Sequence, residues 1–311
     1  MTTLLSIVVP VYNSELTLRE LVARIKSSVS NIQINLEIIL VDDRSIDNSW
    51  DLIDELCVGD ESIIGIRLSR NFGQHNAISA GLDISKGDWV VVMDADLQDL
   101  PEDIPRLYER ALEGFDQIIG RRTSRQDSFL KRLGSKIFWT VFKFLSGEKI
   151  TSNIGNFGLY SRSVIDAICE LKEQNRAFGL MASWVGFKRT DIEVARAQRV
   201  SGKSEYSFRK MLRLAARGII SHSERLLYLT VATGVTFVLI GLSYAGFLTF
   251  RYLINDSVYP GWSSIISVII FSSGVIICSV GVVALYVGEV FSQTKNRPIY
   301  FVSETVNTNR I

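Results

Sequence analysis

Two long uncharged runs near the C-terminus constrain this chain most. Leu226–Phe250 holds 25 consecutive residues without a charged side chain, and a second run covers Ser257–Gly288, with its apolar centre at Ile265–Val287. At about 1.5 Å per helical residue, each run can cross a hydrocarbon core of about 30 Å. The sequence therefore predicts a transmembrane hairpin over 226–290. Two buried helices of a soluble core are the alternative.

Basic residues flank the two runs and indicate their orientation. Because such residues stay on the cytoplasmic side of a membrane, we expect a multi-pass protein of the inner membrane with its catalytic domain and both termini in the cytoplasm. The short connection between the runs has Arg251 alone at its edge. The flanking residues are Arg209, Lys210, Arg213, Arg217 and Arg225 before the first run, and Lys295 and Arg297 after the second.

The composition excludes several classes of site. A formal net charge of +1 creates no global field for nucleic acid, which is not an expected partner. Three cysteines lie far apart and form no CxxC pair, so neither a disulfide framework nor a zinc site is indicated. Because only two histidines are present, any metal ion must be held mainly by oxygen ligands.

The first 120 residues alternate strand-like and helix-like segments. The runs LLSIVVPVY, LEIILVDD and WVVVMDAD are rich in Val and Ile and end in polar residues. Such runs suit an α/β domain with a mostly parallel sheet covered by helices. Ligands bind beyond the carboxyl ends of the strands in such sheets. The polar residues at these ends are Asn13, Asp42, Asp43, Asp94 and Asp96.

Two further segments are amphipathic and basic. The segments 128–146 and 206–221 place apolar and basic side chains at helical spacing, which is typical of interfacial helices on anionic headgroups. Ordinary helices packed on the sheet are the alternative for each. The predicted organisation is a domain over 1–225 that includes both helices, the hairpin over 226–290, and a tail over 291–311 whose last ten residues look loose.

The strongest local signal is the D-x-D pair that follows the third run. Asp94 and Asp96 at a strand end can place oxygens around one hard cation, and Gln98 can add a neutral oxygen. Mg²⁺ or Mn²⁺ would bridge these ligands to substrate phosphates and neutralise the charge of a leaving group. The alternative is that the acids merely cap a turn or a helix.

The ends of the other two runs suggest a nucleotide site. Asp42 or Asp43 can accept hydrogen bonds from a base edge or from ribose hydroxyls. Asp47 is better explained as a helix cap, and His75 as a structural hydrogen-bonding residue. The remaining candidates are Pro10, Tyr12 and Asn13 as a wall for the base, Arg70 as a phosphate ligand, and Gly73 as a point of close backbone approach.

These motifs resemble the family 2 glycosyltransferases of the polyprenyl-phosphate branch, which includes dolichol-phosphate mannose synthase and bacterial undecaprenyl-phosphate glucosyltransferases. The resemblance runs from Leu5 through Tyr206, and the two-span anchor matches the bacterial members. The motifs that carry it are VVPVYN, VDDRSIDNS, RNFGQHNAISAGLDISKGDWVVVMDADLQDLPE and RVSGKSEYS.

The resemblance implies a GT-A nucleotide-binding domain and inversion at the anomeric carbon of the transferred sugar. It implies that Asp94, Asp96 and Gln98 hold the metal ion and the donor pyrophosphate. Pro10, Tyr12, Asp42 and Asp43 would line the nucleoside. Residues that fall where the family binds the acceptor phosphate are Arg122, Lys131 or Arg132, Ser135 and Arg199.

Three positions depart from the family pattern. Arg44 replaces the usual glycine of D-D-G-S, so the nucleoside loop is a place where the conformation can differ. Glu205 replaces a lysine, and Asn156 stands where relatives often carry a catalytic Asp. Asn cannot act as a general base, but a phosphate-monoester acceptor is mostly dianionic at pH 7 and needs positioning more than deprotonation. Asn156 is then expected to position the acceptor or a sugar hydroxyl.

The predicted function is sugar transfer from a nucleotide sugar, with UDP the expected nucleotide, to undecaprenyl or another polyprenyl phosphate. One alternative is transfer onto a lipid-linked saccharide. Another is an inactive membrane scaffold, which the departures at Arg44 and Asn156 keep open. A homo-oligomer is also left open, because glycines such as Gly234 and Gly274 permit close packing of membrane helices.

Overall fold

The computed structural model describes residues 3–32, 34–122, 154–195, 225–255 and 261–308. They form two compact units. One holds the described residues up to 195 together with those from 297 onward, and the other holds the long helices between them. Several predictions lie outside the described residues: the two amphipathic segments, and the residues Lys131, Arg132, Ser135, Arg199 and Glu205.

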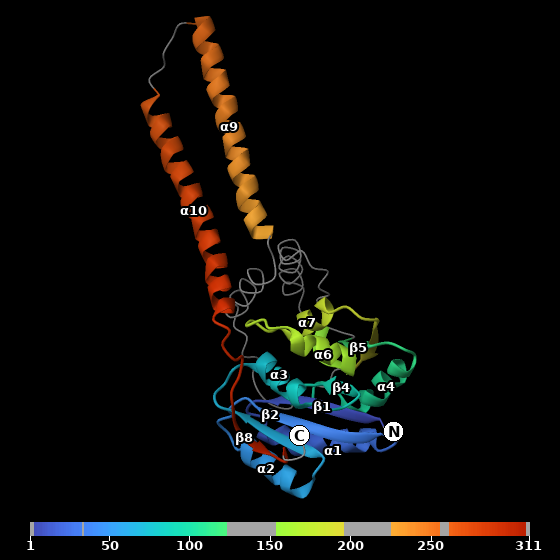
Figure 1. The fold of residues 1–311 in the computed structure, drawn as a ribbon. Coiled ribbons are helices and arrows are strands. Elements are labelled where there is room, and N and C mark those ends of the chain that lie inside the picture. Colours follow the sequence, from blue (N-terminus) through green and yellow to red (C-terminus); the bar gives the residue numbers. More distant parts are fainter. Residues whose placement is uncertain (1–2, 33, 123–153, 196–224, 256–260, 309–311) are drawn as a thin grey trace. The chain divides into compact units, whose positions relative to one another are not determined.

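One eight-stranded sheet organises the first unit, in the order β7-β5-β6-β4-β1-β2-β3-β8 (Figure 1). The central strands β3, β2, β1 and β4 run parallel, as do β5 and β7, whereas β6 and β8 pair antiparallel with their neighbours. The strands are β1 (Leu4–Val11), β2 (Asn35–Asp42), β3 (Ile63–Leu68), β4 (Trp89–Val92), β5 (Gln117–Arg122), β6 (Ile154–Ser161), β7 (Arg189–Val194) and β8 (Val302–Val306).

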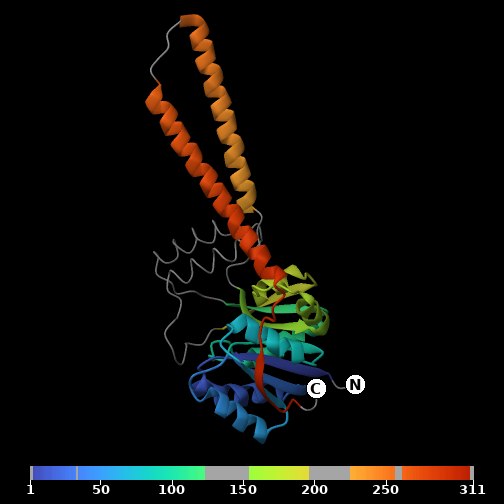
Figure 2. The same cartoon turned by 60° about the vertical axis from the view of Figure 1, so that its left-hand side comes forward.

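Helices cover both faces of this sheet (Figure 1, Figure 2). Alternate residues of β1 enter two separate cores: Ile7 packs in one and Val8 in the other. A strand buried on both faces must be apolar throughout, which is why these runs lack the alternation of a half-exposed strand. The first core is completed by α1 (Glu15–Val29), α2 (Ser49–Gly59) and α4 (Ile104–Leu112), and the second by α3 (Gln74–Ile84), α6 (Arg162–Glu170) and α7 (Phe178–Trp184).

The end of the chain differs from the expected loose tail. Residues Val302–Val306 form β8, which pairs antiparallel with β3 at the edge of the sheet. Asn307 then donates from its side-chain amide to the carbonyl oxygens of Cys57 (2.7 Å) and Ile63 (2.9 Å). The domain predicted over 1–225 therefore lacks one of its strands, which arrives from the C-terminal end of the chain.

The second unit contains two long helices, α9 (Arg225–Asn255) and α10 (Trp262–Thr294). The rings of Phe237 and Phe271 meet between them, with centroids 5.1 Å apart. Within the described residues, one helical stretch is long and apolar enough to cross a membrane, namely Phe271–Thr294, with a mean hydropathy of 2.1. The shorter apolar stretch Leu227–Gly241 lies on α9.

Candidate active site

The loops that follow β1, β2 and β4 are joined to one another at the carboxyl edge of the sheet. The amide of Asp43 donates to the carbonyl of Val11 (2.8 Å), which keeps the ends of β1 and β2 in register. The amide of Asn13 donates to Oγ of Ser45 (3.0 Å). The Thr17 hydroxyl donates to the carbonyl of Ala95 (2.7 Å) and joins α1 to the loop after β4. The predicted convergence of these strand ends is confirmed.

A cavity of about 380 Å³ lies between these loops. The carboxylates of Asp47 and Asp96 reach it from different loops, and the start of α1 supplies most of the remaining wall. Asp47 also accepts hydrogen bonds from the amides of Ser49 (3.1 Å) and Glu15 (3.2 Å), so it caps the first turns of both α2 and α1, which agrees with its interpretation as a helix cap. The lining residues are Asn13, Ser14, Glu15, Leu16, Thr17, Asp47 and Asp96.

The D-x-D pair sits in a tightly constrained turn. Oδ1 of Asp94 accepts a hydrogen bond from Nε2 of Gln74 (2.6 Å), and Oδ1 of Asp96 accepts one from the amide of Gln98 (3.1 Å). Leu97, directly after the pair, is buried and has a φ of 57°, a left-handed conformation that costs a residue with a Cβ roughly 1–3 kcal/mol. Such strain is typical of loops held in one shape for a ligand.

Gln74 is not among the site residues that the sequence indicates. It is the first residue of α3, and its amide orients the first carboxylate of the D-x-D pair. Its position directly after Gly73 could have drawn attention to it, since a helix N-terminus at a strand edge is a common place for anionic ligands.

The donor atoms at this edge suit a hard divalent cation that also binds substrate. The residues offered are two carboxylates and the buried side chain of Gln98. Among the described residues no three His, Cys, Asp or Glu side chains gather in a metal-binding cluster. A cation held here would therefore need further oxygens from water and a phosphate ligand, which is how Mg²⁺ is commonly bound. The assignment of Asp94, Asp96 and Gln98 as metal ligands stays a prediction.

The two carboxylates that end β2 are already engaged by the protein. Asp42 is fully buried, accepts the amide of Ser45 (3.0 Å) and lies 3.4 Å from Nε of Arg67. Asp43 accepts the amides of Phe72 (2.7 Å) and Gly73 (2.8 Å). Burial raises the pKa of Asp43 to about 6, against the lowering effect of these two amides. Both carboxylates shape the loops of the site, and their direct contact with a donor stays a prediction.

The other predicted donor residues lie along the same edge. Pro10, the second-last residue of β1, is buried, whereas Tyr12 is 41% exposed. The guanidinium of Arg70 lies 4.6 Å from the ring centroid of Phe72, on the loop between β3 and α3. Gly73 has a φ of 94°, which a side chain would strain. Their roles in binding a donor are untested by this geometry.

His75 behaves as the structural residue that the sequence predicts. Its Nδ1 accepts a hydrogen bond from the amide of Phe178 (3.3 Å), and burial lowers the pKa of the imidazole. A neutral ring that serves as an acceptor between α3 and α7 has no evident part in catalysis.

Asn156 and the D-x-D turn lie beyond the same end of the pairing between β6 and β4. The last pair joins Gly158 to Val92, so Asn156 lies two residues beyond it along β6 and Asp94 follows it by two residues after β4. Asn156 is half-buried. Arg122 is the last residue of β5, the strand on the other side of β6. Arg121 pairs with Ile154, so Arg122 is on the neighbouring strand but beyond the level of Asn156.

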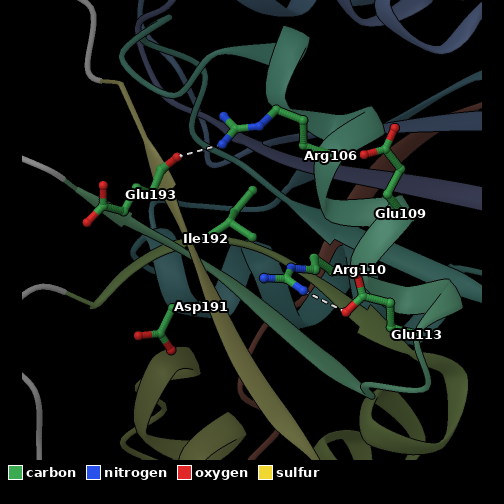
Figure 3. A pocket seen from close by; sticks show the side chains of 7 residues that line it. All are labelled: Arg106, Glu109, Arg110, Glu113, Asp191, Ile192 and Glu193. Atoms are coloured by element: carbon green, nitrogen blue, oxygen red, sulfur yellow. Dashed lines mark hydrogen bonds and ion pairs between the residues drawn. The ribbon is translucent and has the colours of Figure 1, made fainter.

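A second cavity of about 380 Å³ lies between α4 and β7 and contains none of the predicted site residues (Figure 3). Its charges are mostly satisfied within the protein: Arg110 pairs with Glu113 (2.6 Å), and Arg106 donates to the carbonyl of Glu193 (3.2 Å). It is a solvated charged surface. Its lining residues are Arg106, Glu109, Arg110, Glu113, Asp191, Ile192 and Glu193.

Comparison with known proteins identifies the family to which this chain belongs. Residues 6–169 match glycosyl transferase family 2. An uncharacterized glycosyltransferase, YkcC of Bacillus subtilis, is 36% identical over 96% of this chain and 93% of its own. The undecaprenyl-phosphate 4-deoxy-4-formamido-L-arabinose transferase of Proteus mirabilis is 33% identical over 98% and 94%, and the prophage-derived bactoprenol glucosyl transferase of Shigella flexneri is 33% identical over 98% and 99%.

A solved structure supports the fold. Glucosyl-3-phosphoglycerate synthase of Mycobacterium tuberculosis, in complex with Mn²⁺, uridine-diphosphate-glucose and phosphoglyceric acid, aligns with 70% of this chain and 78% of its own at a TM-score of 0.50 and 17% identity. At that identity the likeness concerns the fold alone, which is of the GT-A type. With the strand-end carboxylates in place and a family match that covers the strands from β1 to β6, this chain belongs to glycosyltransferase family 2.

Proposed function

We propose that this chain transfers a sugar from a nucleotide-sugar donor, with UDP the expected nucleotide, to undecaprenyl or another polyprenyl phosphate, with inversion at the anomeric carbon. The observation that carries the proposal is the 33% identity, over 98% of the chain, to relatives named for transfer to undecaprenyl phosphate and bactoprenol. The cavity at the strand ends, flanked by Asp96, provides the place for the donor.

In this proposal the residues of the cavity hold the donor. Asp94 and Asp96 bind Mg²⁺ or Mn²⁺ together with the donor pyrophosphate, and the cation supplies charge neutralisation for the departing nucleoside diphosphate. Gln74 keeps the Asp94 carboxylate oriented through its 2.6 Å hydrogen bond. The loops of Tyr12 and Asp43 bind the nucleoside.

The acceptor chemistry suits a site with an amide where relatives often have a carboxylate. A phosphate monoester has a second pKa near 6, so its attacking oxygen is already ionised at neutral pH. Such a nucleophile needs alignment and loss of water rather than a base. Asn156, which lies beyond the same end of the β4–β6 pairing as Asp94, would hold the acceptor or a sugar hydroxyl, and Arg122 at the end of β5 would bind the phosphate. A sugar hydroxyl as acceptor would require a base.

We further propose that α9 and α10 form a membrane hairpin that keeps the catalytic unit at the cytoplasmic face. The 31 residues of α9 and the 33 of α10 exceed the length needed to cross a bilayer, and Phe237 and Phe271 join the two helices. A lipid-phosphate acceptor makes such an anchor useful, because its reactive group stays at the membrane surface.

Asp96→Asn tests the function and the metal site together. The variant keeps the volume and the oxygen that accepts the Gln98 amide, but it loses the charge that a cation needs. With a panel of radiolabelled nucleotide sugars, undecaprenyl phosphate and Mg²⁺ or Mn²⁺ in detergent, we expect transfer to fall by about a hundredfold or more, since several kcal/mol of charge stabilisation depend on the cation.

Glu109→Gln is the matched control, because it removes an exposed carboxylate on α4, outside the cavity of Asp96. It should transfer sugar like the parent, and both variants should retain the parent's thermal unfolding. Undiminished transfer by Asp96→Asn would contradict the metal assignment. Labelling of an isolated lipid-linked saccharide instead of undecaprenyl phosphate would contradict the assignment of a lipid phosphate as the acceptor. Absence of turnover by the parent with every donor would favour the scaffold alternative.

A further inference from the structure

The segment that follows α10 reaches the loops of the candidate active site. α10 ends at Thr294, and β8 (Val302–Val306) then runs along β3, the strand whose end leads into the Arg70–Gly73 loop (Figure 1). This segment lies at the far C-terminal end of the chain, beyond the family match over 6–169. None of its residues is assigned a role by the motifs discussed above.

Glu304 of β8 holds a half-buried arginine, Arg67, in place. Its Oε1 pairs with NH1 of Arg67 (3.1 Å), and its Oε2 accepts a hydrogen bond from Nε1 of Trp50 (3.2 Å). The guanidinium of Arg67 also lies 5.5 Å from the Trp50 ring centroid. Because both oxygens of Glu304 are used and the ring covers one side, the Arg67 side chain, 22% exposed, has one defined position.

Arg67 in turn lies against Asp42, the residue at which β2 ends and the loop after it begins. Its Nε lies 3.4 Å from Oδ2 of Asp42, a carboxylate with no exposed surface. A buried carboxylate is stable only when a cation or hydrogen-bond donors accompany it. The other oxygen of Asp42 accepts the amide of Ser45, and the Ser45 hydroxyl accepts the amide of Asn13. The conformation of the loops after β1 and β2, two of the three that border the cavity, therefore depends on Asp42.

A second, separate contact reaches the loop after β3. The amide of Ser69 donates to the carbonyl of Phe301 (2.8 Å), and the Phe301 ring packs against Phe72 with centroids 6.5 Å apart. The amides of Phe72 and Gly73 bind the Asp43 carboxylate. The C-terminal segment thus supports the nucleoside end of the site from two sides, through an ion pair and through a ring contact.

We propose that Glu304 is a positioning residue of the donor site: acting through Arg67 and Asp42, it fixes the loop over 42–49 in the shape that binds the nucleoside part of the donor. The inference rests on the proposed function for its ligand, a nucleoside diphosphate sugar. Its effect is on donor binding, while the bond-making groups near Asp94 and Asn156 are unaffected.

Glu304→Gln tests the inference with two measurements on the full-length protein. The amide can still accept the Trp50 N–H but no longer carries the charge that holds Arg67. We expect the donor KM and the Kd of UDP to rise about three- to tenfold, the loss typical of one charge-assisted hydrogen bond. The kcat and the acceptor KM should stay within about twofold. Hydrogen exchange of the 42–49 amides should become faster.

Ser303→Ala is the matched control on the same strand. It removes a hydroxyl that donates to the carbonyl of Arg67 (3.1 Å) but leaves the Glu304 carboxylate in place. A merely structural role for β8 predicts the same effect from both variants. The inference predicts parental donor KM and parental exchange of 42–49 for Ser303→Ala.

Arg67→Gln gives an independent check. A double variant combines Glu304→Gln with Arg67→Gln. If Glu304 acts through Arg67, the donor KM of the double variant should be no higher than that of Arg67→Gln alone, whereas independent roles would make the two effects on donor KM additive. Additive effects, or unchanged donor KM and unchanged exchange in Glu304→Gln, would overturn the inference. A parent that binds no nucleotide would instead refute the proposed function, and the exchange of the 42–49 amides would still decide whether Glu304 positions the loop.

Discussion

Three residues with side chains adopt a left-handed backbone at the ends of the strands that meet at the cavity. They are Asn13 after β1 (φ 50°), Arg44 after β2 (φ 61°) and Leu97 after β4 (φ 57°). Each such conformation costs a residue with a Cβ roughly 1–3 kcal/mol, and such strain concentrates where a ligand site requires one loop shape. The hydrogen bonds between these loops provide the compensating stability.

Arg44→Gly should stabilise the protein, because glycine adopts a φ of 61° without strain. We expect the free energy of unfolding to rise by about 0.5–1 kcal/mol, after the larger entropy of glycine in the unfolded chain is subtracted. Denaturant unfolding of the purified protein measures the change. Arg44→Ala is the control: it removes the same guanidinium but keeps the Cβ, so it should give no gain. Equal stability of the two variants would contradict strain as the cause.

Asp43 makes the stability of the catalytic unit depend on pH in a defined direction. Its pKa in the folded protein, about 6, lies above the ordinary value of an aspartate in an unfolded chain. A raised folded-state pKa contributes stability that is present below the unfolded pKa and is lost as the pH rises through about 6.

Asp43→Asn should therefore gain stability relative to the parent between about pH 4 and pH 7. The variant also loses one of the two hydrogen bonds from the amides of Phe72 and Gly73, because an Asn side chain has one acceptor oxygen, but this loss does not change with pH. Unfolding midpoints of both proteins across this range measure the difference between them. A difference that stays flat with pH would mean that the Asp43 carboxyl does not titrate near pH 6.

At the scale of elements, the position of α3 depends on its close packing against the sheet at Gly81. A Cβ on Gly81 would overlap Cγ1 of Val8 on β1 and lie 3.1 Å from Cγ2 of Val41 on β2. Because both valines are buried and stiff, the added methyl group could fit only if the helix moved away. The start of α3 carries Gln74, so the depth of this packing also fixes the amide that orients Asp94.

Gly81→Ala should lower the free energy of unfolding by up to about 2 kcal/mol, since an overpacking cost of about 1–3 kcal/mol opposes a gain of about 1 kcal/mol in helix propensity. Gly59→Ala is the matched control, because a Cβ at the last residue of α2 meets nothing within 4 Å. It should be neutral or stabilising in the same denaturation experiment. A stabilising effect of Gly81→Ala would show that the added methyl group fits between α3 and β1 without overpacking.

At the scale of the whole molecule, the sequence predicts best what is local. The strands β1, β2 and β4 and their polar ends follow from runs that are apolar on both faces, and the parallel arrangement then brings those ends together. The pattern also marks Arg44, because an arginine where glycine is usual falls on a residue with a positive φ.

What the sequence does not reveal depends on partners distant in the chain. β8 has only five residues, nearly all exposed, so its pattern lacks the apolar faces that identify a strand, and its pairing partner lies more than 200 residues earlier. Gln74 has the sequence context of an ordinary helix start, and its role emerges only when α3 and β4 are brought together. Local pattern cannot supply such contacts, because they exist only in the folded sheet.

The late position of β8 has a consequence for biosynthesis. Arg67 and Glu304 lie 237 residues apart, so at roughly 5–20 residues per second the ribosome delivers the edge strand about 10–50 s after β3. Throughout that interval β3 has an unpaired edge, of the kind that recruits strands from other nascent chains. The apolar helix α10 must also leave the ribosome before the edge is closed. Translation that stops between α10 and residue 302 therefore yields a chain in which the edge of β3 stays open.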